Sequence, residues 1–130
     1  MAWPDIVAVT ITYLDGLSAF NGVTVANEVP GTMPTKLLQV RRVGGTKAPP
    51  VRDRGRLDLI AWADTSAEAM ALALLARTHI NALWGTVTGG VTIYRVDEFL
   101  GPRQIDDPLT GKKRVLQTQT LTFRTDEAIR

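Results

Sequence analysis

The stretch "LQVRRVGGTKAPPVRDRGRLDLIAWAD", from Leu38 to Asp64, decides how the rest of the sequence is interpreted. Both of its ends have the apolar, partly alternating pattern typical of strands. Its middle contains two glycines, two prolines and a series of arginines. The pattern predicts strands at residues 36–43 and 56–63, joined by a long basic loop over residues 44–56.

The second of these strands has two different faces. Because side chains alternate along a strand, one face carries Leu57, Leu59, Ala61 and Ala63, and the other carries Arg56, Asp58, Ile60 and Trp62. We expect the first face to carry the core. The second face is mixed, so part of it is expected to be covered as well, and Trp62 is a candidate for contact with a neighbouring molecule.

Length and composition indicate one folded domain spanning residues 1–130. The hydrophobic share is 45% and the charged share 22%, which is ordinary for a globular chain. The formal net charge of +2 is too small to indicate nucleic-acid binding by itself. The sequence has no cysteine, which excludes disulfides and thiolate chemistry. No signal peptide or apolar run of membrane-spanning length is visible, so we expect a protein that stays or assembles in a cytoplasm, without a membrane partner.

The N-terminal stretch at residues 3–20 fits two structures. Its β-branched residues alternate as in a strand, but its apolar residues also form a helical stripe. Pro4 followed by Asp5 resembles a helix start, which favours a helix. The next stretch, "GVTVANEVP" at residues 22–30, predicts a short strand ended by Pro30.

Residues 65–85 predict the clearest helix. Thr65 and Glu68 have the spacing of a capping box, and Gly85 lies where a C-cap glycine is expected. Apolar residues occur almost all the way around this helix. We therefore expect it to pack on two surfaces, which are the sheet and a partner subunit.

The last third predicts two strands, at residues 89–100 and 114–125, flanking the loop "GPRQIDDPLTGKK" at residues 101–113. The order of elements predicts an α+β fold. In detail, we expect a mainly antiparallel sheet with two helices packed on one face, plus long projecting hairpin loops.

The residues capable of chemistry do not form a recognisable active site. His79 is the only histidine, so it cannot build a zinc site with others. Asp97, Glu98, Asp106 and Asp107 could suggest an acid–base pair or a hard-cation site. However, Asp106 and Asp107 precede Pro108 and a turn, and turn chemistry explains them. Motifs for a nucleophile or a phosphate cradle are missing from the sequence, so we expect no enzyme, no metal and no cofactor.

The basic loop has three interpretations. Its cationic residues are Arg41, Arg42, Lys47, Arg52, Arg54 and Arg56. In the first, these residues lie on a solvated hairpin and form local ion pairs with Asp53 and Asp58. In the second, they contact another protein. In the third, they form a surface that lies near DNA. Aromatic residues do not interleave with them in the sequence, which disfavours stacking on single-stranded nucleic acid.

Nearly the whole chain resembles a known family, the tail terminator (tail completion) proteins of long-tailed bacteriophages. The resemblance rests on the order of features, from an opening helix, "PDIVAVTITYL", to a closing strand that ends in "FRT". Its most specific pieces are "VRRVGG", "DRGRLDLIAWA" and "GPRQIDDPLTGKKR".

The resemblance implies a virion protein of the head–tail interface, with helices packed against a sheet. It implies a homohexameric ring that caps the tail tube at full length, stops polymerisation and offers a surface to the head connector. The implied partners are further copies of the chain, the tail tube protein and a head completion (stopper) protein. Genomic DNA would pass through the lumen without sequence-specific binding.

Assembly contacts are expected at the charged loops and at Trp62. The candidate residues are Arg41, Arg42, Lys47, Arg52, Arg54, Arg56, Trp62, Asp106, Asp107, Lys112 and Lys113. Two other functions stay open at this point. One is a different virion adaptor, such as a head–tail stopper or a tube subunit, and the other is a small DNA-binding protein with a basic arm.

Overall fold

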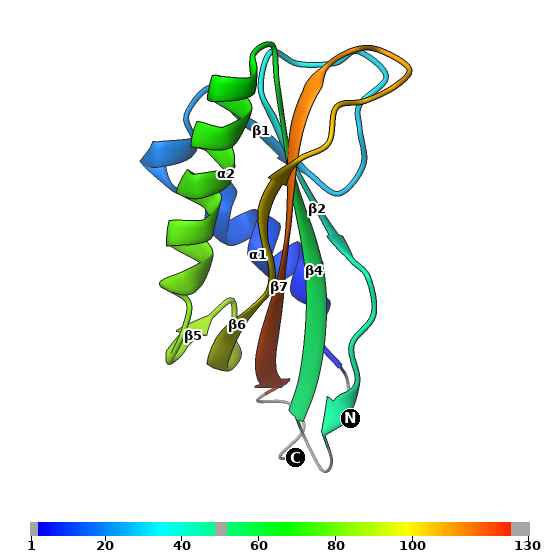
Figure 1. Cartoon of the computed structure of the whole chain (residues 1–130). Helices are drawn as coiled ribbons and strands as arrows, with labels where there is room; N and C mark the ends of the chain where they lie inside the picture. Colours follow the sequence, from blue (N-terminus) through cyan, green and yellow to red (C-terminus); the bar gives the residue numbers. More distant parts are fainter. Residues whose placement is uncertain (1–2, 49–51, 126–130) are drawn as a thin grey trace.

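The fold is a curled sheet with two helices packed against it (Figure 1). The structure, a computed structural model, describes residues 3–48 and 52–125. Within these residues, the strand order is β1-β2-β4-β7-β6-β5, and β3 pairs with β4 beside this path. None of the helices in the described ranges is long and apolar enough to cross a membrane.

The sheet is mixed. β1 pairs with β2 in parallel, whereas β2–β4, β3–β4, β4–β7, β5–β6 and β6–β7 pair antiparallel. The α+β class predicted from the sequence is confirmed. The strands are β1 (Thr24–Ala26), β2 (Leu37–Arg42), β3 (Lys47–Ala48), β4 (Arg52–Ala63), β5 (Thr86–Thr88), β6 (Val91–Gln104) and β7 (Lys113–Thr125).

The N-terminal stretch is a helix, as its capping signals predicted. In α1 (Ile6–Asp15), the Asp5 carboxylate accepts hydrogen bonds from the amides of Val7 and Ala8. Such bonds satisfy amides that have no partner in the first helical turn. A short 3-10 turn, Ser18–Phe20, follows. The strand predicted at residues 22–30 is shorter than expected and contains only Thr24–Ala26.

Helix α2 (Ser66–Asn81) begins as predicted and ends earlier. Thr65 accepts from the Glu68 amide, and its hydroxyl also donates to the Glu68 carboxylate at 2.9 Å. The prediction of Gly85 as the C-cap is wrong, because Ala82 is the C-cap. Gly85 instead has a φ of 78° and ends the turn that leads into β5, where left-handed backbone favours glycine.

The core lies between the sheet and the helices. Leu57, Leu59, Ala61 and Ala63 are fully buried there, so the face predicted to carry the core is confirmed. Alanines of α2, including Ala69, Ala73 and Ala76, are also fully buried, and their small size lets the helix approach the sheet closely.

The opposite face carries a second, smaller cluster at one end. Leu37, Ile60 and Trp62 are buried there, with Met33 and Leu116 packed against them. Trp62 is only 6% exposed in the isolated subunit. The ring is therefore largely covered by its own chain, and a contact between Trp62 and a neighbouring molecule stays a prediction.

The basic loop is much shorter than predicted. β4 begins at Arg52, so Arg52, Arg54 and Arg56 lie in a strand and pair with β7. Lys47 lies in β3, and the Arg54 amide donates to the Thr46 carbonyl. Gly45 permits this approach, because an added Cβ would lie 1.8 Å from the Arg54 carbonyl oxygen. The two prolines at positions 49 and 50 lie outside the described residues.

The second loop is also shorter than predicted. β6 continues to Gln104, which pairs with Val115, and β7 already begins at Lys113. The connection therefore spans residues 105–112. Register shifts at Ile93/Arg95, Glu98/Leu100 and Leu100/Arg103 bend β6 along the way, as bulges do.

A candidate assembly surface

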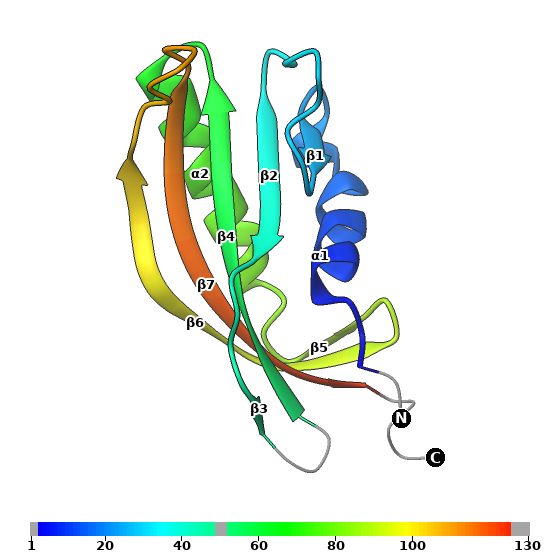
Figure 2. The ribbon, with the colours of Figure 1, turned by 90° about the vertical axis from the view of Figure 1, so that its right-hand side faces the viewer.

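Figure 2 shows the face of the sheet that the helices leave uncovered. The strand registers place arginines of several strands on this face. Cross-strand partners share a face, so the register decides which side chains meet. Arg52 lies opposite Arg124, and Trp62 lies opposite Arg114. We define the arginine face as the outward positions of Arg41 on β2, Arg52, Arg54 and Arg56 on β4, Arg95 on β6, and Arg114 and Arg124 on β7.

Aromatic rings from other strands, and Trp84 from the turn after α2, lie beside four of these guanidinium groups. The distances from guanidinium carbon to ring centroid are 4.6 Å for Arg52–Tyr94, 3.8 Å for Arg56–Phe99, 5.4 Å for Arg95–Trp84 and 5.2 Å for Arg114–Trp62. Such stacking fixes a flexible side chain while leaving nitrogen donors at its edge. Arginine and aromatic side chains therefore alternate on the folded surface, although they do not alternate along the sequence.

Carboxylates balance only a small part of this charge. Asp58 pairs with Arg41 at 3.3 Å and accepts from the Thr118 hydroxyl, and Asp97 pairs with Arg95 at 2.9 Å. In the described part of the chain, no acid pairs with the remaining five, which are Arg52, Arg54, Arg56, Arg114 and Arg124. The Nε atoms of Arg56 and Arg124 are buried without a hydrogen-bond partner. The isolated subunit thus leaves both charge and donors unsatisfied on this face.

A groove crosses the arginine face beside β6. It has a volume of about 580 Å³ and is lined by Arg52, Arg54, Trp84, Tyr94, Arg95, Asp97, Thr120 and Thr122. Its walls offer guanidinium and hydroxyl donors together with ring faces. The combination suits an anionic side chain that also carries apolar surface.

Two predicted residues lie away from this face. Arg42 pairs with Asp53 at 3.1 Å and also donates to the Gly44 carbonyl. Asp53 is only 6% exposed, so the pair belongs to the fold at the base of the β3–β4 hairpin. Lys47 is exposed on β3, in register with Asp53.

The charges of the 105–112 loop and its flank are used locally. Lys112 pairs with Asp64 at 2.6 Å and Lys113 with Asp106 at 3.0 Å. Hydrogen bonds from Gln104 and Lys113 lower the pKa of Asp106. A hydrogen bond from Thr110 lowers the pKa of Asp107, which caps its own turn. Both carboxylates have internal partners, which agrees with the turn interpretation.

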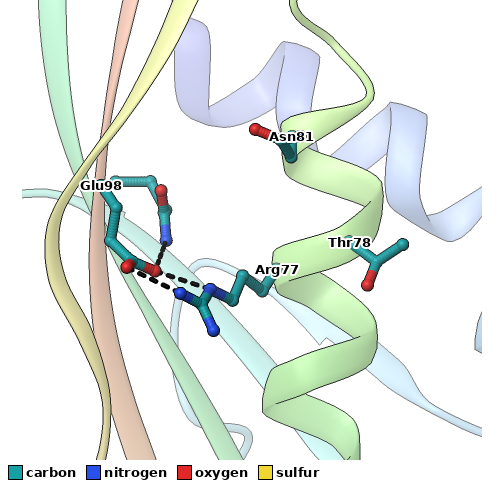
Figure 3. Close-up of a pocket in the computed structure, with 5 residues that line it drawn as sticks. Arg77, Thr78, Asn81 and Glu98 are labelled. Atoms are coloured by element: carbon teal, nitrogen blue, oxygen red, sulfur yellow. Dashed lines mark hydrogen bonds and ion pairs between the residues drawn. The ribbon is translucent and has the colours of Figure 1, made fainter.

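A polar pocket of about 420 Å³ lies between α2 and the sheet (Figure 3). In it, Arg77 pairs with Glu98 at 2.7 Å, and Gln119 donates to the same carboxylate at 3.1 Å. Gln117 continues the network by donating to the Ala73 carbonyl. These bonds tie the helix to the sheet. Glu98 therefore has a structural role, and Asp97 likewise pairs with Arg95.

His79 has a structural environment. It packs edge-on against Phe20, with ring centroids 5.7 Å apart, and its carbonyl accepts from the Tyr13 hydroxyl at 2.9 Å. Burial raises the pKa of Tyr13. Among residues 3–48 and 52–125, no group of three acidic, histidine or cysteine side chains is placed to hold a metal ion.

Sequence reasoning missed part of the arginine face. Arg95, Arg114 and Arg124 were not singled out, and neither were the rings of Trp84, Tyr94 and Phe99. One signal was available, since the alternating strand at residues 114–125 begins and ends its polar side with arginine. Placing that side against the arginines of β4 required the register of two strands far apart in the sequence.

The fold is that of a small α+β protein with a mixed sheet. Comparison with known families assigns it more closely: a family described as phage tail termination protein matches residues 2–129. The chain belongs to this family of bacteriophage tail proteins, as its resemblance predicted. No curated protein matches it.

Proposed function

We propose that the protein assembles into a ring of identical subunits, most simply a hexamer, that caps the finished tail tube. The ring ends tube polymerisation and then offers its free side to the head completion (stopper) protein. The observation that carries this proposal is the family match over residues 2–129. The function is binding, without catalysis or a cofactor.

The surfaces of the subunit support such a role. A closed ring needs two different patches on each subunit that fit one another. The helix side offers exposed apolar residues, including Leu74 at 45% exposure, and the loop tip offers Leu109 at 92%. The arginine face is a third, separate surface. Genomic DNA passes through the lumen of the ring, without sequence-specific binding.

Electron microscopy of particles made without the protein tests the proposal. Tails of uncontrolled length identify a terminator. Tails of normal length beside unjoined heads identify instead a stopper or another joining adaptor. Normal, joined particles refute both functions.

Native mass measurement separates the ring from the monomer. We expect a hexamer mass, either for the free protein or only after tail tubes are added, because a tube can template the ring. A monomer under both conditions refutes the ring. A monomer with salt-dependent DNA affinity indicates a small basic DNA-binding protein.

A further inference from the structure

We propose that the arginine face docks onto a carboxylate-rich surface of a different virion protein. This inference rests on the proposed function, because it assumes that the chain works inside a tail assembly. It goes further by naming the surface and the chemistry of its partner. Three observations support it. They are the type of cation, the ring contacts that fix its geometry, and the shortage of unpaired acids among residues 3–48 and 52–125.

The cations of this face are arginines alone. Lys47 and Lys113 lie in register with Asp53 and Ala63, whose side chains point to the helix side. Protein interfaces are enriched in arginine, tyrosine, tryptophan and phenylalanine and depleted in lysine, and the arginine face has that composition. A surface that only neutralises DNA phosphates has no such preference against lysine.

The arginines are also held in place before a partner arrives. Outward positions along β4 repeat about every 6.8 Å, two residues at about 3.4 Å each. Tyr94 and Phe99 stack on the two outer members of the Arg52–Arg54–Arg56 series. Because these side chains are already ordered, pairing with carboxylates costs less conformational entropy. Strand-spaced forks suit carboxylates presented by another folded protein.

A passing genome is a poorer fit for this face. Five guanidiniums per subunit have no acidic partner in the described residues. Repeated around a ring, they would release many counterions from DNA and hold it tightly. A channel that must let DNA leave quickly works better with few uncompensated cations.

A second copy of the chain is also a poor fit. Seven of the described carboxylates are in ion pairs, Asp5 caps α1 and Asp107 holds its own turn. In residues 3–48 and 52–125, this leaves Asp15 and Glu28 as acids without an assigned partner. Among the described residues, two dispersed acids match five arginines on one surface poorly, which favours carboxylates presented by another protein.

The test supplies the full chain to cells infected with a phage that lacks its gene. The cell extracts are treated with nuclease, so that DNA does not link the particles. The variant Arg52→Glu/Arg54→Glu reverses two exposed charges, and Lys36→Glu/Lys47→Glu reverses two charges away from the face. The amount of protein per purified tail and per joined particle is measured by quantitative mass spectrometry. We expect the arginine variant to fall at least about tenfold in tails or joined particles, while the lysine variant stays near the parent. The amount of Arg52→Lys/Arg54→Lys in tails or joined particles should lie between those of the other two variants. Lysine keeps the positive charge but loses the planar guanidinium that can bind a carboxylate with two hydrogen bonds.

The other outcomes overturn the inference in different ways. Normal incorporation followed by failed DNA release means that the face contacts DNA. Loss of the ring mass in the purified variant means that a second copy occupies the face. Normal incorporation and release mean that the face is solvated. If the double variant does not fold, the single variant Arg54→Glu answers the same question. If the parent protein itself is absent from tails, the proposed function is wrong. That result differs from failure of the docking inference, in which the parent is present and the arginine variant is incorporated equally well.

Discussion

The two faces of the sheet use the same strands for different purposes. Along β4, Leu57 and Leu59 point to the helices and are fully buried, whereas Arg54 and Arg56 point to the other side and have no acidic partner in the described residues. One face gains free energy by removing apolar surface from water. The other holds like charges together on aromatic rings, which contributes little to folding. The difference indicates that the helix side contributes most of the stability, and it is the basis for the proposal that the arginine face binds a partner.

The largest expected effect is on the helix side. Leu59→Ala should lower the free energy of unfolding by about 2–5 kcal/mol, because the removed side chain leaves a cavity in the main core. Leu59 has no exposed surface, and its neighbours come from both the sheet and the helices. Urea unfolding of the monomer measures the change. A loss below about 1 kcal/mol would mean that the core does not close around this residue.

Trp62→Ala should be the next largest, although Trp62 lies on the other face. The change removes a buried ring, its hydrogen bond to Gln39 at 3.3 Å and the contact with Arg114. We expect a loss of about 2–3 kcal/mol, because the small cluster lies near the surface and can partly collapse. The same urea measurement checks it. If unfolding is unchanged while tail binding is lost, Trp62 serves an interface, as the sequence had suggested.

Asp53→Asn probes the base of the β3–β4 hairpin. It removes the ion pair with Arg42 and leaves a cation beside a nearly buried polar site. The expected loss is about 1–2 kcal/mol, less than for a fully buried pair, because the Arg42 side chain is 34% exposed. Asp15→Asn, at an exposed acid at the end of α1, is the matched control in thermal unfolding. Equal melting temperatures for both variants would mean that the β3–β4 hairpin behaves as a solvated loop and that its ion pair does not stabilise the fold.

The sequence was sufficient for elements whose signals are local. The N-cap Asp5, the Thr65–Glu68 pair and the alternation of Leu57 to Ala63 predicted two helices and the core face. It was insufficient where pairing over long distances decides the structure. Residues 52–56 contain charges and a glycine, so they look like a loop, but β7 supplies a partner strand that makes them β4. Gly55 fits there because an added Cβ would contact Ile6 and Phe123 at 3.0 and 3.2 Å.

The candidate site shows the same division. The sequence identified Arg52, Arg54 and Arg56 as a group, but as members of a long loop between two strands. Their partners Tyr94 and Phe99 come from β6, which reaches them only across β7. Composition of one segment therefore cannot reveal a surface assembled from three strands. Replacing residues 47–54 by a flexible linker would be harmless if they formed a loop, but here it would remove paired residues of β3 and β4.

Arg54→Glu should have almost no effect on folding. Its side chain is exposed and has no ion pair or ring contact in the described residues, so we expect a change within about 0.5 kcal/mol. A slight gain in stability is expected, because reversing one charge relieves repulsion from Arg52 and Arg56. Thermal unfolding at low and high salt measures it, with Leu59→Ala as the reference for a core change. A loss comparable to that of Leu59→Ala would mean that both faces serve stability.

The smallest expected effect concerns the 105–112 loop, which lies beyond both faces. The Asp107 carboxylate accepts from the amides of Leu109 and Thr110 at 3.4 and 3.2 Å, and hydrogen bonding holds its pKa below the ordinary value of 3.8. Because the folded pKa is below the unfolded one, this contribution is present above pH 3.8 and is lost as pH falls through the folded pKa. The Leu109 and Thr110 amide shifts should therefore titrate in NMR spectra below pH 3.8 in the parent and not in Asp107→Asn. Asp106→Asn is the control, because its carboxylate bonds Gln104 and Lys113 instead. A calcium-dependent change in these shifts that Asp107→Asn abolishes would show that the Asp107 carboxylate binds a metal ion. The turn interpretation would then be wrong.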